Sequence, residues 1–551
     1  MREAITTIRA MATVLFVSIS MSSGMVDGRA APASPAVGSG QRPGKQAKFT
    51  PIPRSPLAAG SAQDVSAAAE TFYFAEGYTG SGFDETIVVF MPNQAGRIYI
   101  DLYPRGHEPL SGYIDLPAAT SEYVDVNGIL EGVYNLPPGQ QVSARVALPY
   151  EGVAERTIFF TTPTWHGSTD LVGVTSPSLE WDFAEGSTLS SFSEFLTLQN
   201  PDPATAAHVV LDYLTDPPAQ VTKALTLPAA SRTTVEVFKG GLISTPPGQE
   251  CVPSGSAASC GVGPGIGGVS VRVTSDQPII AERPFYLNGV NFGAGPIRDA
   301  HDSFGATGPG TQWSFAEGTT ASGFKEYLTV ENPGAEPALV DLDYVITGSR
   351  TVLRRELTAA PQSRTTVEVW KGTASSQPVL GCVANGAGAN CGVGRGVGGV
   401  SVLVTSSGAA PQPIVVERPM YMVHDFGSGP VAGAHDVVGA TAPVTRLGFS
   451  ALSTYAGDND YLTIENQNAV AAQVTITYYN GGLNLVHQQL TVGAQTRATV
   501  ETWKADTGSH YPVGVLLRSD QPIVVEKPTY SSDPLGYGAT DTLAFSPPNG
   551  F

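Results

Sequence analysis

Charged residues, cysteines and basic charge are all scarce in this sequence. Only 14% of its 551 residues are charged, against about 25% in an average protein, while 42% are apolar. A chain kept disordered by its own charge is therefore excluded, because enough apolar side chains are present to build cores. Lysine and arginine total 30 against 49 aspartates and glutamates, a net charge of −19. This balance argues against a nucleic acid or an anionic membrane as partner, since both need basic patches.

The sequence also lacks an apolar run of the roughly 20 residues that cross a bilayer. The apolar run over residues 10–21 is shorter, follows Arg2 and Arg9, and is followed by small and polar residues. This order of basic, apolar and small segments predicts a secretory signal over residues 1–30. We therefore expect a secreted protein, extracellular or associated with the cell surface, with no integral membrane segment.

Glycine and proline, in contrast, are plentiful, with 62 and 43 residues. Their share stays below that of a low-complexity disordered chain, so the composition indicates a folded, turn-rich protein. Residues 31–71 consist mostly of Ala, Pro, Ser and Gly. This segment predicts a flexible linker.

Four blocks of sequence recur along the rest of the chain. The first reads Phe-Ala-Glu-Gly at residues 74–77, 183–186 and 315–318. The second begins with Glu85, Glu194, Glu326 or Asp460, the third with Ser-Arg-Thr-Thr at 231 and 363, and the fourth with Glu-Arg-Pro at 282 and 417. The repeat length is about 109 residues, and copies two and three carry an insertion between the third and fourth blocks. The spacing predicts independently folding modules over residues 72–180, 181–312, 313–446 and 447–551.

The local pattern within each module predicts short strands. Residues 269–274, Val-Ser-Val-Arg-Val-Thr, place valines on one face and polar side chains on the other. Turn residues recur at intervals of about ten, and no convincing long amphipathic helix follows residue 70. We expect an all-β fold, a tandem array of four immunoglobulin-like antiparallel β-sandwiches arranged as a rod. A small barrel is the alternative for each module.

The four cysteines form two pairs with the same spacing, each with eight residues between them. Cys251 and Cys260 lie in the insertion of copy two, and Cys382 and Cys391 lie in that of copy three. An extracellular location permits disulfides, so we expect two local bridges, Cys251 to Cys260 and Cys382 to Cys391. Neither insertion contains a histidine to complete a zinc site, and no metal or cofactor is expected.

No catalytic motif is convincing. Residues 263–268 and 394–399 match G-x-G-x-x-G, but a strand is expected after each one, where dinucleotide binding requires a helix. His301-Asp302 and His435-Asp436 have the residue types of a general base and its orienting carboxylate. Copies one and four keep the Asp but have Thr in place of His, which favours a structural role. We expect no catalytic, cofactor-binding or metal-binding residue.

Glutamates recur at two positions of the repeat. An active site is normally assembled once per chain, so recurrence in every module favours a structural role. The glutamates of the fourth block are each followed by Arg or Lys, and we expect ion-paired, hydrogen-bonded structural carboxylates. The recurring residues are Glu76, Glu185 and Glu317 in the first block and Glu282, Glu417 and Glu526 in the fourth.

Aromatic residues at one repeat position are the best indication of binding. Phe238, Trp370 and Trp503 occupy equivalent positions, and each is followed by Lys. Exposed aromatic rings can stack on sugars, whereas a Trp in a sandwich more often fills the core. We therefore keep these three as candidate ligand-contact residues.

The recurring blocks resemble a repeat domain of secreted and cell-surface proteins of bacteria. The resemblance rests on Phe-Ala-Glu-Gly, on residues 326–333, on Glu-Arg-Pro-Met-Tyr at 417–421 and on Ala-His-Asp-Val-Val-Gly-Ala-Thr at 434–441. It covers residues 72 to about 545, and copies two and three match best. The resemblance implies an extracellular β-sandwich array and brings no catalytic residues with it.

These observations favour a secreted, envelope-associated structural or adhesive protein that acts by surface or multivalent binding. Its expected partner is a cell-envelope or extracellular polymer, protein or polysaccharide, or further copies of itself. A first alternative is an extracellular glycan-binding protein, in which repetition raises avidity. A second is a polysaccharide-degrading enzyme with a site in copy one, which diverges most and has 13 acidic and 4 basic residues.

Overall fold

A computed structural model describes residues 45–52 and 69–547, except 217, 350, 428, 456, 482–484, 506 and 533–536. The predicted signal over residues 1–30 lies outside the described residues. The chain divides into two units, residues 1–41 and 42–551. The structural description below concerns the second unit alone.

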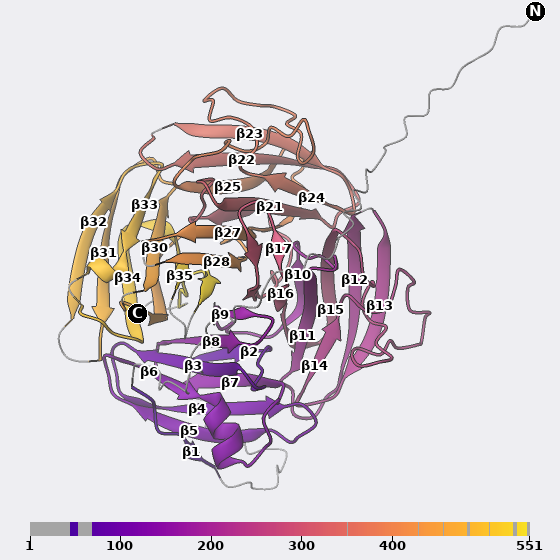
Figure 1. Ribbon diagram of the computed structural model, residues 1–551, viewed down its shortest axis with the longest axis vertical. Helices are drawn as coiled ribbons and strands as arrows, with labels where there is room; N and C mark the ends of the chain where they lie inside the picture. The colour runs from indigo at the N-terminus through magenta and orange to yellow at the C-terminus, as the bar shows by residue number, and fades with distance from the viewer. Residues whose placement is uncertain are drawn as a thin grey trace, which may run out of the picture. The chain divides into compact units, whose positions relative to one another are not determined.

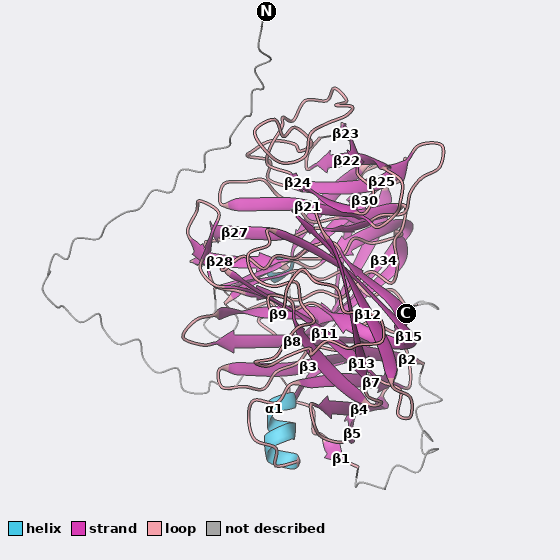
Figure 2. Ribbon diagram, turned by 90° about the vertical axis from the view of Figure 1, so that its right-hand side faces the viewer, coloured by secondary structure: helices cyan, strands magenta, loops and turns pink. Residues whose placement is uncertain are grey.

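Each of the four repeats forms a sandwich of antiparallel sheets, which confirms the predicted all-β fold class (Figures 1 and 2). Module 1 contains β2 (Glu70–Phe74), β3 (Phe83–Met91), β4 (Gly96–Pro104), β5 (Leu110–Leu116), β6 (Thr120–Asp125), α1 (Val126–Gly128), η2 (Ile129–Val133), β7 (Val142–Leu148), β8 (Val153–Thr161) and β9 (His166–Val172). Module 2 contains β10 (Ser178–Phe183), β11 (Phe192–Asn200), β12 (Ala207–Asp216), β13 (Gln220–Leu227), β14 (Ser231–Glu236), β15 (Gly268–Glu282), β16 (Phe285–Leu287), β17 (Val290–Asn291), β18 (Pro296–Ile297) and β19 (Ala300–His301).

The last two modules repeat the same order of strands. Module 3 contains β20 (Gln312–Phe315), β21 (Phe324–Asn332), β22 (Ala338–Ile346), β23 (Val352–Ala359), β24 (Ser363–Glu368), β25 (Val400–Ser407), β26 (Val415–Glu417), β27 (Met420–Asp425) and β28 (Pro430–His435). Module 4 contains β29 (Val444–Leu452), β30 (Asp458–Asn466), β31 (Ala472–Tyr479), β32 (Val486–Val492), β33 (Thr496–Glu501), η3 (Thr502–Lys504), β34 (Val513–Glu526), β35 (Thr529–Ser531) and β36 (Gly538–Thr540). The first strands begin at Ser178, Gln312 and Val444, so the predicted boundaries at 181, 313 and 447 fall slightly late.

In modules 2 and 4 one strand passes from one sheet to the other, whereas in modules 1 and 3 two consecutive strands, β7 and β8 or β25 and β26, take its place. In module 2 the outer sheet has the order β13-β12-β15-β10, and the end of β15 leaves it to pair with β11 of the inner sheet. Pro278 lies at this crossing, where a residue without an N–H interrupts ladder hydrogen bonding. Modules 3 and 4 have Pro413 and Pro522 at the equivalent place, and module 1 has Pro149 two positions earlier. Each sandwich encloses its own core, in which Trp181 and Trp313 are completely or almost completely buried.

The four modules close on one another in a cycle, so the predicted rod is wrong. Their last strands, β9, β19, β28 and β36, are neighbours: β9 contacts β19 and β36, and β28 contacts the same two strands. Figure 1 shows the modules in this cyclic order, with the inner sheets nearest the centre. The repeat pattern predicts the fold of each module, but it does not predict which other module packs against it. The cyclic arrangement therefore could not be predicted from the repeats.

Part of the predicted linker belongs to module 1. Strand β1 (Thr50–Pro51) pairs with the edge strand β5, and Gln46 bridges to Tyr123. Ala47 is 6% exposed, and the Phe49 ring meets Tyr134 edge-on with centroids 6.3 Å apart. The expectation of a linker over all of residues 31–71 is therefore corrected. Ala47 and Phe49, apolar residues in a segment of mostly small residues, help to cover the β5 edge of the sheet. Residues 31–44 and 53–68 lie outside the described part of the chain.

Candidate functional site

A buried cation joins each module to the next. Arg156 of module 1 lies 2.8 Å from Glu282 and 2.5 Å from Asp302 of module 2, and all three side chains are fully buried. The equivalent groups are Arg283 with Glu417 and Asp436, Arg418 with Glu526 and Asp541, and Lys527 with Glu155 and Asp170. The last group joins module 4 to module 1. The recurring Asp of the His-Asp pairs thus binds a cation of the preceding module.

The same glutamates also bind the backbone of the first sequence block. Glu282 accepts hydrogen bonds from the N–H groups of Ala75 and Glu76, at 2.6 and 3.1 Å. Glu526 does the same for Ala316 and Glu317, and Glu417 accepts from the N–H of Glu185. The Phe-Ala-Glu-Gly block is therefore the end of the first strand and the segment after it, which the following module holds in place.

A second ion pair crosses three of the four interfaces. Glu76 pairs with Arg232 at 3.0 Å, Glu185 with Arg364 at 3.0 Å, and Glu317 with Arg497 at 3.1 Å. At the interface between modules 4 and 1 both partners are missing, because Ala451 and Ser121 occupy their positions. There the Ser121 hydroxyl donates to the Ser450 carbonyl at 2.6 Å. Phe90, Val153, Tyr479 and Leu516 form a separate apolar cluster across this interface.

The centre of the cycle is occupied by one carboxylate. Asp299 accepts hydrogen bonds from the N–H groups of Ala300 at 2.8 Å, Ala434 at 3.0 Å and Ala539 at 3.1 Å, and also from the N–H of Ser168. One donor comes from each module. Burial nevertheless raises the pKa of Asp299 well above its usual range, and the four backbone hydrogen bonds offset this only in part.

Both His-Asp pairs are split by the geometry of their strands. Neighbouring side chains on a strand point to opposite faces, so Asp302 reaches Arg156 while the His301 ring packs on Phe285 with centroids 4.9 Å apart. Burial lowers the pKa of His301 and His435 well below the usual value, with a further contribution from Arg283 or Arg418. Both imidazoles are therefore neutral, and His435 faces Asp541 of module 4, at 3.8 Å.

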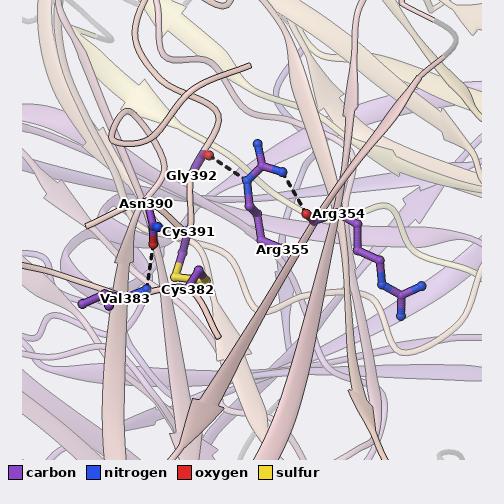
Figure 3. The surroundings of a disulfide bond; sticks show 7 residues. All are labelled: Arg354, Arg355, Cys382, Val383, Asn390, Cys391 and Gly392. Atoms are coloured by element: carbon purple, nitrogen blue, oxygen red, sulfur yellow. Dashed lines mark hydrogen bonds between the residues drawn. A yellow bond between two sulfur atoms is a disulfide. The ribbon is translucent and has the colours of Figure 1, made fainter. Parts of the chain in front are cut away.

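The two insertions are each closed by a disulfide. Cys251 bonds to Cys260 and Cys382 to Cys391, with Cα atoms 5.0 and 5.1 Å apart. Beside the second bridge, Arg355 donates to the carbonyls of Arg354 and Gly392, and the Asn390 carboxamide oxygen accepts from the Val383 N–H (Figure 3). Arg355 also reaches the carbonyls of Thr373 and Ser375. The insertion is thus anchored by a buried guanidinium as well as by its disulfide.

The three candidate aromatic residues share one packing arrangement. Phe238, Trp370 and Trp503 meet Phe195, Tyr327 and Tyr461 edge-on, with centroids 5.3, 4.5 and 4.9 Å apart. Trp370 is only 6% exposed. Each ring thus packs on an aromatic residue of its own module, in modules 2, 3 and 4, and Trp370 also borders a cavity.

That cavity, of about 540 Å³, lies between modules 2 and 3. Phe292 of module 2 borders it, together with Phe324, Trp370 and Tyr421 of module 3. Two cations, Lys325 and Arg395, complete the wall. The Lys325 ammonium lies 4.5 Å from the centre of the Trp370 ring, within cation–π range. Of the residues that border it, sequence reasoning had selected Trp370 alone.

Sequence reasoning from recurring residues did not select Asp299, Lys325 or Arg395, because each of them is found in one copy of the repeat. Each departs from the repeat: Asp299 replaces the Gly of the other copies, and Lys325 replaces Asp84, Ser193 or Asn459. Arg395 stands where module 2 has Pro264. A residue that differs from its equivalents in the other copies was the sequence signal that could have identified these three positions.

The comparisons with known proteins add little. No protein-family model matches the chain, and no curated protein is similar enough to count as a relative. A solved structure of a tetra-tandem repeat in the extending region of a large adhesion protein aligns with 88% of this chain and 97% of its own, at 11% identity and a TM-score of 0.10. A similarity this weak carries no argument about fold or function. Within the described ranges, none of the helices has the length and apolar character needed to cross a bilayer.

Proposed function

We propose that this protein is a secreted, envelope-associated structural or adhesive protein that acts by binding rather than by catalysis. The observation that carries the proposal is the use of the recurring charged residues. Each module contributes one buried cation that pairs with carboxylates of the next module and holds the two modules together. These cations are Arg156, Arg283, Arg418 and Lys527. Such a scaffold presents its loops and interfaces at fixed separations, as multivalent binding requires.

An extracellular polymer is the partner that this arrangement suits best. The scaffold's repeated residues provide rigidity, and the loops that differ between modules provide the contact surface. Glycan binding is the more specific form of the proposal, and it is favoured by the aromatic cavity between modules 2 and 3.

Immunolabelling of intact producing cells, combined with capture of partners by the intact protein, tests the proposal. Label on cells or in an extracellular assembly is the expected result, with a cell-envelope polymer in the captured material. Protein found only in the culture fluid, never on cells or in an assembly, contradicts it. Release of new reducing ends from a polysaccharide panel, measured with the same preparation, favours the degrading enzyme instead.

A further inference from the structure

Two cations, Lys325 and Arg395, border the cavity between modules 2 and 3. Within the described ranges neither cation forms an ion pair with a carboxylate, although the Glu368 carboxylate is near enough for its charge to act on Lys325. The chain as a whole has an excess of acidic residues and a net charge of −19, and most other cations described above have a carboxylate partner. Two free cations on one cavity wall therefore require an explanation.

The two cations also act on each other. Burial, and then the nearby charge of Arg395, lower the pKa of Lys325. Glu368 acts in the opposite direction and raises this pKa, while Lys371, whose ammonium pairs with Glu368 at 2.7 Å, lowers it further. An anion placed between Lys325 and Arg395 would relieve this repulsion. The geometry of the wall thus favours a negatively charged ligand.

The site is assembled in one copy of the repeat only. The position of Lys325 is Ser193 in module 2, and that of Arg395 is Pro264, although the flanking glycines have the same left-handed backbone in both modules. Gly263 and Gly265 have φ of 90° and 88°, and Gly394 and Gly396 have 88° and 84°. The fold of the loop therefore does not require an arginine. The ion-paired residues that join the modules recur, whereas these two cations do not.

The remaining wall is aromatic. The Phe292 ring of module 2 packs on Tyr421 of module 3 with centroids 4.4 Å apart and ring planes tilted by 30°, and Phe324 also borders the cavity. Tyr421 and Phe324 are 4% and 6% exposed, whereas Phe292 is partly exposed. Rings that contribute apolar surface next to cations match a sugar with an acidic substituent, since a sugar ring has apolar faces and its carboxylate suits a guanidinium fork. The cavity volume of about 540 Å³ falls within the range of small-ligand sites.

We propose that this cavity binds an acidic saccharide, a sugar unit bearing a carboxylate, with Arg395 and Lys325 on the carboxylate and the aromatic rings against the sugar. This inference rests on the proposed function and names the polymer as an acidic polysaccharide. The ligand bridges the two modules, because Phe292 comes from one and both cations come from the other.

Calorimetric titration of the full-length protein tests this inference. The probes are trigalacturonate, its methyl ester as a neutral control of the same shape, triglutamate peptide and inorganic sulfate. Trigalacturonate is expected to bind at least about tenfold more tightly than the other three, because only it offers both the charge and the sugar faces. Equal binding of sulfate or triglutamate overturns the proposal in favour of a general anion or peptide site, and no binding of trigalacturonate at millimolar concentration also overturns it.

The matched variant is Lys325→Ser with Arg395→Pro, which installs the residues that module 2 already has. Loss of two charge-assisted contacts is expected to weaken trigalacturonate binding at least about tenfold, with the thermal unfolding transition unchanged. Arg395→Gln alone serves if the double variant fails to fold. Lys504→Ser, an exposed cation in module 4, is the control and should leave the affinity within about twofold. Equal weakening by the control indicates general charge attraction and overturns the assigned site.

These results separate the site from the proposed function. Cell-surface labelling that persists while trigalacturonate fails to bind removes the acidic saccharide and leaves the envelope role standing. Trigalacturonate binding by a protein found only in culture fluid supports the acidic-saccharide site and contradicts the envelope role.

Discussion

The Lys527 ammonium lies 2.6 Å from the Glu155 carboxylate, although 372 positions separate the two residues in the chain. Both side chains are fully buried, and Asp170 is 2.8 Å from the same ammonium. This contact joins the last module to the first. If modules 4 and 1 were apart, Lys527 in module 4 would lose its carboxylate partners, and Glu155 and Asp170 in module 1 would lose their cation.

Replacing Lys527 by Met should therefore destabilise the folded protein strongly. The substitution keeps the length of the side chain but leaves Glu155 and Asp170 buried without a cation, a loss of about 3–5 kcal/mol for a buried pair. Equilibrium unfolding in guanidinium chloride measures the change in free energy. The surface pair Arg97–Asp115 provides the control, since Arg97→Met should have little effect. Equal small effects of both variants contradict a role for Lys527 in closure.

Much of the scaffold could be predicted from repetition, but its closure could not. Recurrence of Glu282 and its equivalents predicted ion-paired, hydrogen-bonded structural carboxylates, and the adjacent Arg283 was the basis for the ion pairing. Adjacent residues on a strand face opposite sides, so Glu282 pairs with Arg156 of the preceding module and Arg283 pairs with Glu417 of the following one. The sequence shows which residues are charged in every copy, but not that their partners lie a module away.

The ends of the repeat give conflicting signals about closure. Ala451 and Ser121 lack the second ion pair, which is the pattern of an open array with no neighbour beyond its ends. Lys527, Glu155 and Asp170 are retained, which is the pattern of a closed one. Only the three-dimensional arrangement shows that the closing interface keeps the first set of contacts and replaces the second with an apolar cluster around Phe90.

A pH dependence is expected from the buried glutamates of the second block. Burial raises the pKa of Glu194 to about 8. Between about pH 5 and 8 the unfolded chain ionises this group while the folded protein keeps it protonated, so its contribution disfavours folding increasingly as the pH rises. Glu194→Gln removes the effect. The variant should gain stability relative to the parent by up to about 1.4 kcal/mol for each pH unit in this window.

Denaturant titrations at several pH values measure this difference. Glu326→Gln is a parallel test, because burial raises the pKa of Glu326 to about 8 as well. A difference between variant and parent that does not change with pH would falsify the assignment of a protonated Glu194 in the folded state.

The disulfides should contribute measurable but local stability. Cys382 and Cys391 are 9 positions apart, and closing a loop this short is worth roughly 2–3 kcal/mol in the chain-entropy account. Cys382→Ser with Cys391→Ser should lower the unfolding free energy by about that amount. Proteolysis within residues 383–390 should become faster, while Arg355 continues to hold the start and end of the insertion. Unchanged cleavage of the insertion would show that Arg355 alone orders it.

The central carboxylate and its neighbouring glycine should be energetically coupled. A Cβ added at Gly167 would lie 1.7 Å from Asp299 Oδ1, so Gly167→Ala forces the carboxylate away from its four N–H donors. Asp299→Ala leaves those donors without an acceptor, at about 1–3 kcal/mol for each one that stays dry. Both single variants are expected to be destabilised. In the double variant the clash with the carboxylate is absent, so the two losses should not add.

A double-mutant cycle from guanidinium unfolding measures this coupling. We expect the double variant to be more stable than the sum of the single losses implies, by about 1–3 kcal/mol, because both residues compete for the same space. Gly132→Ala is the control for a glycine substitution, since its added Cβ meets nothing within 4 Å. Strict additivity would mean that Asp299 does not occupy the centre of the cycle. Coupling at this position, in contrast, ties the stability of all four modules to one side chain, because each module contributes one of the N–H donors.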